Sequence, residues 1–138
     1  MKTMQVDVAI IGAGTAGLAA YRSAKAAGAS VVIIEGGDHG TTCARVGCMP
    51  SKLLIAAADA ADAVGKAPGF GVHVDGVVRI DGGEVMDRVR RERDRFVDFV
   101  LGDVQDISET DRIRGHAAFV DKHTIAVADY SLIRCKCS

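Results

Sequence analysis

Two cysteines that lie five residues apart, Cys43 and Cys48, are the side chains of this sequence best suited to redox chemistry. They stand where an alanine-rich, helix-forming stretch begins, and in an ideal helix the Cα atoms at positions i and i+5 are about 8–9 Å apart. A disulfide needs a Cα separation of about 4.4–6.8 Å. A bond between the two therefore requires a distorted or only partly helical segment, which Gly47 and Pro50 would permit.

The surroundings of the pair favour a reactive thiolate over a metal site. A helix N-terminus and the nearby Lys52 would each lower the pKa of a thiol, and a five-residue spacing is uncommon among zinc ligands. Two further cysteines, Cys135 and Cys137, could complete a four-thiolate zinc site. We expect them instead to be stray thiols, and we predict no metal centre. Two inert helix cysteines are the structural alternative to the redox pair.

A second group of residues has the spacing of a dinucleotide site: Gly12-x-Gly14-x-x-Gly17, with Glu35 eighteen residues after the last glycine. Gly12 would allow a tight turn, Gly14 would let a pyrophosphate approach the backbone, and Gly17 would let helix and strand pack closely. The N-terminus of the following helix would supply free N–H groups. Glu35 would accept hydrogen bonds from ribose hydroxyls. A purely structural glycine turn is the alternative.

The elements around these motifs have the order of a βαβ unit. A buried strand is predicted over residues 6–11, a helix over 18–27 that Gly28 ends, and a second, parallel strand over 31–34 that Glu35 closes. A polar loop, a helix over 53–64, an extended or loop segment over 70–80 and a long helix over 83–107 follow. Short β-branched runs at 113–120, 124–128 and 132–137 predict a small meander of strands. The fold class is therefore α/β, a Rossmann-like parallel sheet with helices and an antiparallel element near the C-terminus.

Composition excludes several partners. The 138 residues fit one domain, and a net charge of −1 gives no overall attraction to nucleic acid or to an anionic membrane. Five arginines between residues 88 and 95 alternate with Glu92 and Asp94, which predicts a solvated helix face with ion pairs. The apolar stretch over 8–20 is too short to span a bilayer, and Asp7 before it disfavours a secretory signal. We expect a cytoplasmic setting.

The cysteine segment, residues 40–52 (GTTCARVGCMPSK), together with the glycine turn and Glu35, resembles the pyridine nucleotide-disulfide oxidoreductases. Within that family it most resembles the dihydrolipoamide dehydrogenases, and glutathione or mercuric reductase-like specificity stays open. The resemblance covers essentially the whole chain, including the long helix and the Arg114-Gly115-His116-Ala117 segment. Two residues depart from the family's pattern: Thr41 stands where the family often has Gly, and Arg45 where it often has Asn.

The resemblance implies a flavin-dependent disulfide oxidoreductase whose dithiol substrate is of the lipoyl type. Cys43 would be the interchange thiol that meets substrate, and Cys48 the thiol that faces the flavin. Electrons would pass from this pair to FAD and then to NAD. The implied contacts with FAD are made at the pyrophosphate by Gly12, Gly14 and Gly17, at the ribose by Glu35, near the phosphates by Thr42, near the flavin by Lys52, and near the adenine by the backbone around Gly115 and Ala117.

The same resemblance implies that residues 1–138 hold only part of the FAD domain. The family's third FAD segment, its NAD domain, the interface domain of its homodimers and the His–Glu acid–base pair have no counterpart in this sequence. We therefore expect a fragment that cannot complete turnover alone. The alternatives are a non-catalytic flavin-binding module and an unproductive truncated chain. The histidines at 39, 73, 116 and 123 are expected to be loop or surface residues.

Overall fold

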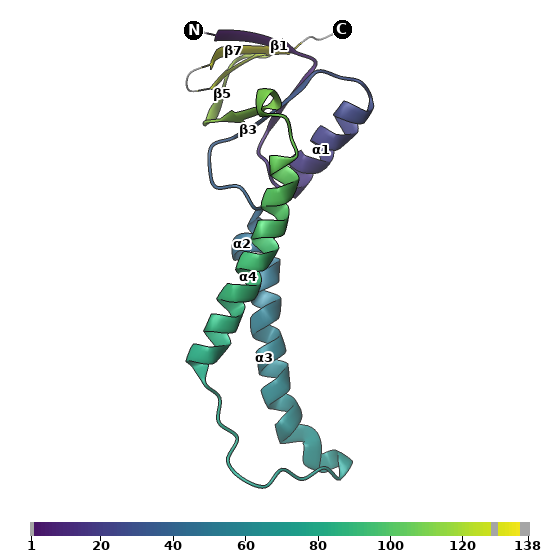
Figure 1. The fold of residues 1–138 in the computed structure, drawn as a ribbon, viewed down its shortest axis with the longest axis vertical. Helices are drawn as coiled ribbons and strands as arrows, with labels where there is room; N and C mark the ends of the chain where they lie inside the picture. The colour runs from purple at the N-terminus through teal and green to yellow at the C-terminus, as the bar shows by residue number, and fades with distance from the viewer. Residues whose placement is uncertain (1, 128–129, 136–138) are drawn as a thin grey trace. The chain divides into compact units, whose positions relative to one another are not determined.

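The computed structural model describes residues 2–127 and 130–135 (Figure 1). They form two compact units: the first holds Met1–Thr41 and Phe99–Ser138, and the second holds Thr42–Asp98. Among the described helices, none is both long enough and apolar enough to cross a membrane.

A three-stranded parallel sheet lies at the centre of the first unit. Its strands β2 (Val8–Ile11), β3 (Val31–Glu35) and β4 (Arg112–Arg114) lie in the order β2-β3-β4. The register pairs Val8 with Val31 and Ile34 with Ile113. The first four residues of β3 are all buried, as expected for a central parallel strand that is covered on both faces. The predicted βαβ unit with a parallel strand pair is confirmed.

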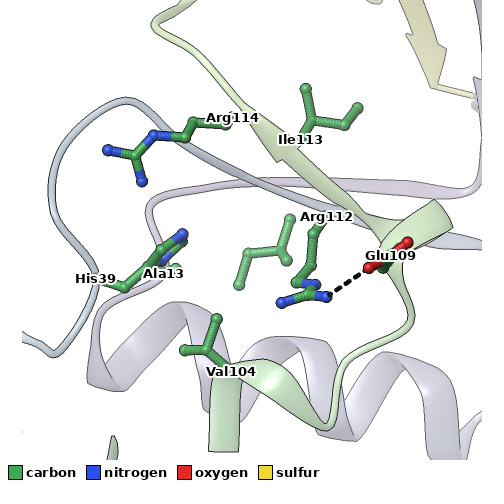
Figure 2. Close-up of a pocket in the computed structure, with 8 residues that line it drawn as sticks. Ala13, His39, Val104, Glu109, Arg112, Ile113 and Arg114 are labelled. Carbon is green, nitrogen blue, oxygen red and sulfur yellow. Dashed lines mark ion pairs between the residues drawn. The ribbon is translucent and has the colours of Figure 1, made fainter. Parts of the chain in front are cut away.

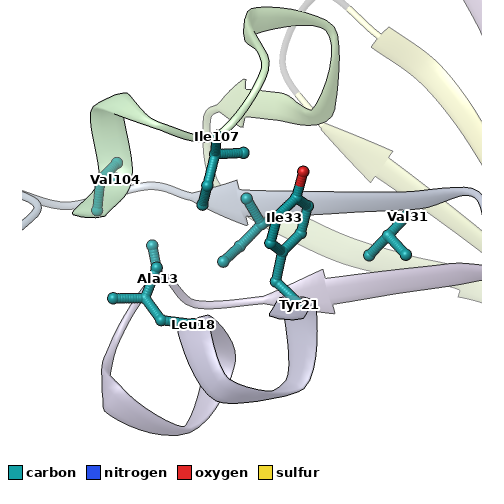
Figure 3. Packing of buried hydrophobic residues seen from close by; sticks show 7 residues of the cluster. All are labelled: Ala13, Leu18, Tyr21, Val31, Ile33, Val104 and Ile107. Carbon is teal, nitrogen blue, oxygen red and sulfur yellow. The ribbon is translucent and has the colours of Figure 1, made fainter. Parts of the chain in front are cut away.

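Alternate side chains of β3 enter two different apolar clusters, because successive residues of a strand point to opposite faces. Val32 and Ile34 pack in one cluster with residues of the strands around them. Val31 and Ile33 pack in the other, against helix α1 and the chain around the end of α4 (Figure 3). The members of this second cluster are Ala13, Leu18, Tyr21, Val31, Ile33, Val104 and Ile107.

A second sheet of the first unit has the order β1-β7-β6-β5, with β1 at Lys2–Val6, β7 at Tyr130–Cys135, β6 at Thr124–Val127 and β5 at Ala117–Asp121. Strand β6 is antiparallel to both β5 and β7, and β1 is parallel to β7. The α/β class and the antiparallel element near the C-terminus are thus confirmed.

Two predicted strands have the wrong bounds, because each divides between the two sheets. The strand predicted over 6–11 divides at Asp7, whose carboxylate accepts hydrogen bonds from both the backbone N–H and the hydroxyl of Ser30. The strand predicted over 113–120 divides at Gly115, which has φ 153°. As a result, β4 joins the parallel sheet and β5 joins the antiparallel one.

Helix α1 (Thr15–Ala26) ends in the glycine cap that the sequence predicts. Gly28 has φ +79°, and its N–H donates to the carbonyl of Lys25 while Ala29 N–H donates to that of Ala24. These two bonds define a Schellman motif. The cap turns the chain directly into β3.

The helices after β3 are α2 (Thr42–Val46), α3 (Cys48–Lys66) and α4 (Gly82–Gln105), with short 3₁₀ turns at Ala67–Phe70 and Glu109–Asp111. Both predicted helices are confirmed, although α3 begins five residues earlier than expected. Residues 72–80 form no strand. On α4 the predicted ion pairs are present, for example Arg90 with Asp87 at 3.0 Å.

Candidate functional site

The glycine turn connects β2 to α1 and is fixed by the backbone. Gly12 has φ +99°, a conformation that side-chain-bearing residues rarely adopt, and its N–H donates to the carbonyl of Ile34 at 2.7 Å. A Cβ on Gly17 would overlap the carbonyl oxygen of Gly12 and would meet Cγ2 of Ile10 at 3.4 Å. A Cβ on Gly14 would meet nothing within 4 Å. The backbone therefore requires glycine at 12 and 17, whereas Gly14 faces open space.

Glu35, at the end of β3, ties the strand to this turn. Its Oε2 accepts the N–H of Ala13 and its Oε1 accepts the N–H of Gly37, both at 2.8 Å. The bond from Gly37 is the main reason that the pKa of Glu35 is lowered from its ordinary value. Partial burial opposes this shift, and the bond from Ala13 and the nearby His39 add to it. Each carboxylate oxygen keeps a further lone pair for another donor.

The end of β4 lies beside the end of β3. Gly115 N–H donates to the carbonyl of Glu35 at 3.0 Å. The imidazole of His116 lies so close to Gly36 that a Cβ there would overlap the ring, and His116 itself is exposed, as expected. Ala117 begins β5 and packs against the apolar cluster that contains Val32 and Ile34. This arrangement places Gly115 directly next to Glu35.

In the second unit, a break between two helices brings the cysteines together. Helix α2 ends at Val46, Gly47 has φ −122° and ψ −111°, and α3 begins at Cys48. A Cβ on Gly47 would lie 3.0 Å from the carbonyl oxygen of Thr42 and 3.4 Å from Cα of Cys43. The segment is therefore only partly helical, as a contact between the cysteines requires. Pro50 lies in the first turn of α3, where its missing N–H leaves no helical bond unmade.

Both thiols of the pair are free, with Cys43 partly buried and Cys48 exposed. The hydrogen bond between the two thiols is the main reason that the pKa of Cys43 is raised. The positive charge of Lys52 acts in the opposite direction but is the smaller effect. The expected lowering by Lys52 is therefore present, but the net pKa of Cys43 is raised, because sequence spacing does not reveal the contact between the thiols.

The residues that flank the pair lie at the start of the helices. Thr41 has φ +58°, a left-handed conformation that a β-branched residue adopts only at a cost. Thr42 is the first residue of α2, and Lys52 lies on the first turns of α3; both are exposed. Among the described residues, no three metal-binding side chains come together. Of the remaining cysteines, Cys137 and the side chain of Cys135 lie outside the described residues.

A cavity of about 270 Å³ lies next to the glycine turn in the first unit (Figure 2). Sequence reasoning missed it and assigned His39, one of its lining residues, to a loop or the surface. Arg112 and Arg114, which line it from β4, were not singled out as site residues. Their spacing of two around a buried isoleucine was the available signal, since such residues share one face of a strand. The lining residues are Ala13, Ile33, His39, Val104, Glu109, Arg112, Ile113 and Arg114.

The site residues predicted from the sequence thus form two groups. The first unit holds the three glycines, Glu35, Gly115 and Ala117 around the carboxyl ends of parallel strands. In open α/β sheets this is the edge at which ligands bind. The second unit holds Thr42, Cys43, Cys48 and Lys52 around one helix break.

Comparison with known proteins finds several dihydrolipoyl dehydrogenases. The chain is 31% identical to the dihydrolipoyl dehydrogenase of Haloferax volcanii, over 88% of this chain and 25% of the relative. It is 34% identical to that of Halobacterium salinarum, again over 88% of this chain and 25% of the relative. A mercuric reductase of Streptomyces lividans is 50% identical over 67 residues, which are 46% of this chain and 14% of the relative. The chain therefore spans about a quarter of the length of the dehydrogenases it matches.

A solved structure has the same fold. It is the Cu(II) complex of the HOCl-induced flavoprotein disulfide reductase RclA from Escherichia coli, with a TM-score of 0.67 and 24% identity. The match covers 98% of this chain and 27% of that one. The sequence profile of the pyridine nucleotide-disulphide oxidoreductases matches residues 6–133. The chain thus belongs to the pyridine nucleotide-disulphide oxidoreductase family, whose members are FAD-dependent enzymes.

Proposed function

We propose that this chain binds FAD and carries the redox-active dithiol of a flavoprotein disulfide oxidoreductase that oxidises a dihydrolipoyl-type dithiol. The observation that carries the proposal is the contact between Cys43 and Cys48 across the helix break at Gly47. Two thiols that hydrogen-bond to each other need little movement to form a disulfide. A pair of this kind in a chain that also has a glycine turn and Glu35 suits electron transfer between a dithiol and a dinucleotide cofactor.

The first unit has a shape that fits a dinucleotide. The space next to Gly14 is open, so a phosphate could approach the backbone there. No side chain forms a capping hydrogen bond at the N-terminus of α1. The free N–H groups of that helix end would favour the negative charge of the pyrophosphate. We assign Glu35 to the adenosine ribose, the backbone at Gly115 and Ala117 to the adenine, Thr42 to the phosphates and Lys52 to the flavin. When bound, FAD would supply a two-electron acceptor for the dithiol and a donor to NAD.

The cysteines would exchange with substrate by thiol–disulfide chemistry. A substrate thiolate attacks Sγ of Cys43 in the oxidised pair, the Cys43–Cys48 bond breaks, and Cys48 leaves as a thiolate. The second substrate thiol, after losing its proton, attacks the substrate sulfur of this mixed disulfide and releases Cys43. The substrate becomes a cyclic disulfide, and the two cysteines gain its two electrons. The raised pKa of Cys43 favours its being protonated in the reduced pair.

An anaerobic titration tests this proposal on the full chain loaded with FAD. Dihydrolipoamide is added, and the flavin absorbance is followed together with the number of free thiols. We expect bleaching in the original chain, none in Cys43→Ser, and unchanged bleaching in Cys137→Ser, which controls for the loss of a cysteine elsewhere. Bleaching that persists in Cys43→Ser would refute the assigned role of the pair. A chain that does not retain FAD after gel filtration would refute the cofactor assignment.

A second candidate, mercuric reductase-like activity, is favoured by the 50% identity to the Streptomyces lividans enzyme over 46% of the chain. Reoxidation distinguishes the two candidates. The FAD-loaded chain is reduced chemically without oxygen and then mixed with lipoamide, glutathione disulfide or Hg(II). We expect lipoamide to restore the flavin absorbance fastest. Faster recovery with Hg(II) would favour the second candidate.

For the whole protein, we propose NAD as the electron acceptor, a homodimer as the assembly and the cytoplasm as the compartment. Free cysteines of this kind suit a reducing compartment, where thiols are kept available for catalysis. These assignments extend from the family resemblance to the parts of such enzymes that lie beyond the segment matched here.

A further inference from the structure

The cavity beside the glycine turn has a polar lining that the proposed redox function does not use. Its apolar side is formed by Ala13 of the glycine turn, Ile33 of β3, Val104 of α4 and Ile113 of β4. Figure 2 shows His39 entering from the loop after β3, and Arg112 and Arg114 both coming from β4. The polar side chains that line this space are therefore mainly basic.

Two nitrogen atoms of this lining are buried without a hydrogen-bond partner in the part of the chain that the structure describes. They are Nδ1 of His39 and Nε of Arg112. The guanidinium Nε can only donate, whereas the imidazole nitrogen can donate or accept. A buried polar atom that lacks a partner is unfavourable, because it has lost its hydrogen bonds to water and gained none in return. A ligand with acceptor oxygens placed in the cavity would satisfy the arginine and, with imidazole as donor, the histidine.

The charge of the cavity points to an anion. Arg112 and Arg114 lie two residues apart on β4 and so project to the same side of the strand. The carboxylate among the lining residues, that of Glu109, approaches Arg112 only to 4.0 Å. Its side chain is 95% exposed, so solvent screens its charge and it neutralises little of the arginine's.

We propose that this cavity binds one small oxyanion of the phosphate type, held by His39 and Arg112, while the positive charge of the exposed Arg114 is screened by solvent. A guanidinium and a tetrahedral oxyanion match in charge and in hydrogen-bond geometry. The volume of about 270 Å³ lies just below the range of about 300–1,000 Å³ that is usual for drug-sized ligands. It suits a small anion better than a dinucleotide. The oxyanion site is additional to the proposed FAD site and does not depend on it.

Equilibrium dialysis of the full chain against radiolabelled inorganic phosphate, at constant ionic strength, tests the proposal. We expect one phosphate per chain, with the affinity reduced about tenfold or more in His39→Leu and in Arg112→Met. Arg90→Met is the matched control, since Arg90 is exposed on α4 and pairs with Asp87. Absence of binding, or equal binding in all of these variants, would overturn the proposal.

Two further measurements test the role of the Arg112 Nε donor and the separation of this site from the FAD site. Arg112→Lys keeps the positive charge but lacks the Nε donor, so we expect intermediate affinity; circular dichroism checks that each variant folds.

Dialysis with excess FAD separates two sources of phosphate chemistry. Phosphate that stays bound supports a separate oxyanion site, whereas displacement by FAD would assign the cavity to the dinucleotide's own phosphates and overturn it. FAD binding itself is read independently from flavin fluorescence.

Discussion

Three glycines of one turn have different physical reasons to be glycine. Gly12 needs a positive φ, Gly17 lies against a carbonyl oxygen, and Gly14 has an ordinary backbone conformation with open space around it. Only the first two follow from the fold of the chain itself. The third would be explained by the proposed FAD, whose pyrophosphate would approach the backbone there, so its substitution should separate stability from binding.

Gly17→Ala should therefore mainly reduce the stability of the chain, whereas Gly14→Ala should mainly reduce FAD binding. Gly17→Ala forces a methyl group into the Gly12 carbonyl, and overpacking of this kind typically costs about 1–3 kcal/mol. Gly14→Ala should change the free energy of unfolding by about 0.5 kcal/mol or less while weakening FAD binding. Urea denaturation and flavin fluorescence measure the two effects. Equal destabilisation by both substitutions would contradict the proposed division of roles.

Glu35 should make stability depend on pH through its two backbone hydrogen bonds. Because these bonds lower its pKa in the folded chain below the ordinary value of 4.5, its contribution is present above that pH. The contribution is lost as the pH falls through the folded pKa. We expect Glu35→Gln to destabilise the chain at about pH 7 and to have a smaller effect at about pH 3. A difference in unfolding free energy that does not change with pH would contradict the assignment; the exposed Glu109→Gln is the control.

Thr41 is a strained residue at the entrance to the cysteine segment. Its left-handed φ of +58° costs a side-chain-bearing residue about 1–2 kcal/mol, whereas glycine in the unfolded chain gains about 0.4–1 kcal/mol of entropy. Thr41→Gly should therefore stabilise the chain by about 0.5–1 kcal/mol. Thr42→Gly, within α2, should destabilise it by about 0.5–1 kcal/mol. Thermal denaturation of the two variants checks the signs, and a loss of stability in Thr41→Gly would show that other contacts of this residue dominate.

At the scale of elements, one polar contact links α1 to the turn before β4. The hydroxyl of Tyr21 donates to Oδ2 of Asp111 at 2.7 Å, and Nζ of Lys25 approaches the same oxygen at 2.9 Å. Burial is the main reason that the pKa of Tyr21 is raised to about 12, and Asp111 adds to the effect. The helix is thus fixed beside the parallel sheet by a buried tyrosine as well as by apolar packing.

Tyr21→Phe should destabilise the chain by about 1 kcal/mol at neutral pH, because the part-buried Asp111 loses a hydrogen bond. Lys25→Met should cost less, since the lysine is half exposed and solvent screens its charge. Because the pKa of Tyr21 is raised in the folded chain, its contribution is complete below about pH 10 and disappears as the pH rises toward 12. Urea denaturation of both single variants and the double variant measures the coupling. Equal losses from both single substitutions would contradict the larger role of the tyrosine.

Local sequence patterns predicted which residues form strands and helices better than they predicted which strands pair with each other. The apolar run of β3 and the glycine cap of α1 depend on neighbouring residues, so the sequence predicted both. The assignment of β4 and β5 to different sheets depends on where a distant strand pairs, and Gly115 alone did not indicate it. Likewise, the spacing of Cys43 and Cys48 led to the prediction of a redox pair, but the raised pKa of Cys43 needed the contact between the thiols.

At the scale of the whole molecule, the two units differ in how much they bury. The first unit contains both apolar clusters, and β3 is its most buried strand. In the second unit, Ala44 and Val89 are the buried apolar residues among those described, and no residue of α3 is buried. Phe70 and Val77 are 86% and 96% exposed. Since burial is the main source of stability in a folded chain, the second unit should open more easily.

Hydrogen–deuterium exchange on the full chain tests this difference. Amides of β3 should exchange only when the first unit unfolds, whereas those of α3 should exchange through local opening, faster by on the order of 100-fold or more. Added FAD should slow exchange at the glycine turn and around Glu35, because a ligand stabilises the state that binds it. The C-terminal end of α3, at Lys66, lies several helical turns beyond Lys52 and is the internal control. Uniform exchange along the chain would mean that the two units unfold together and that burial does not set their relative stability.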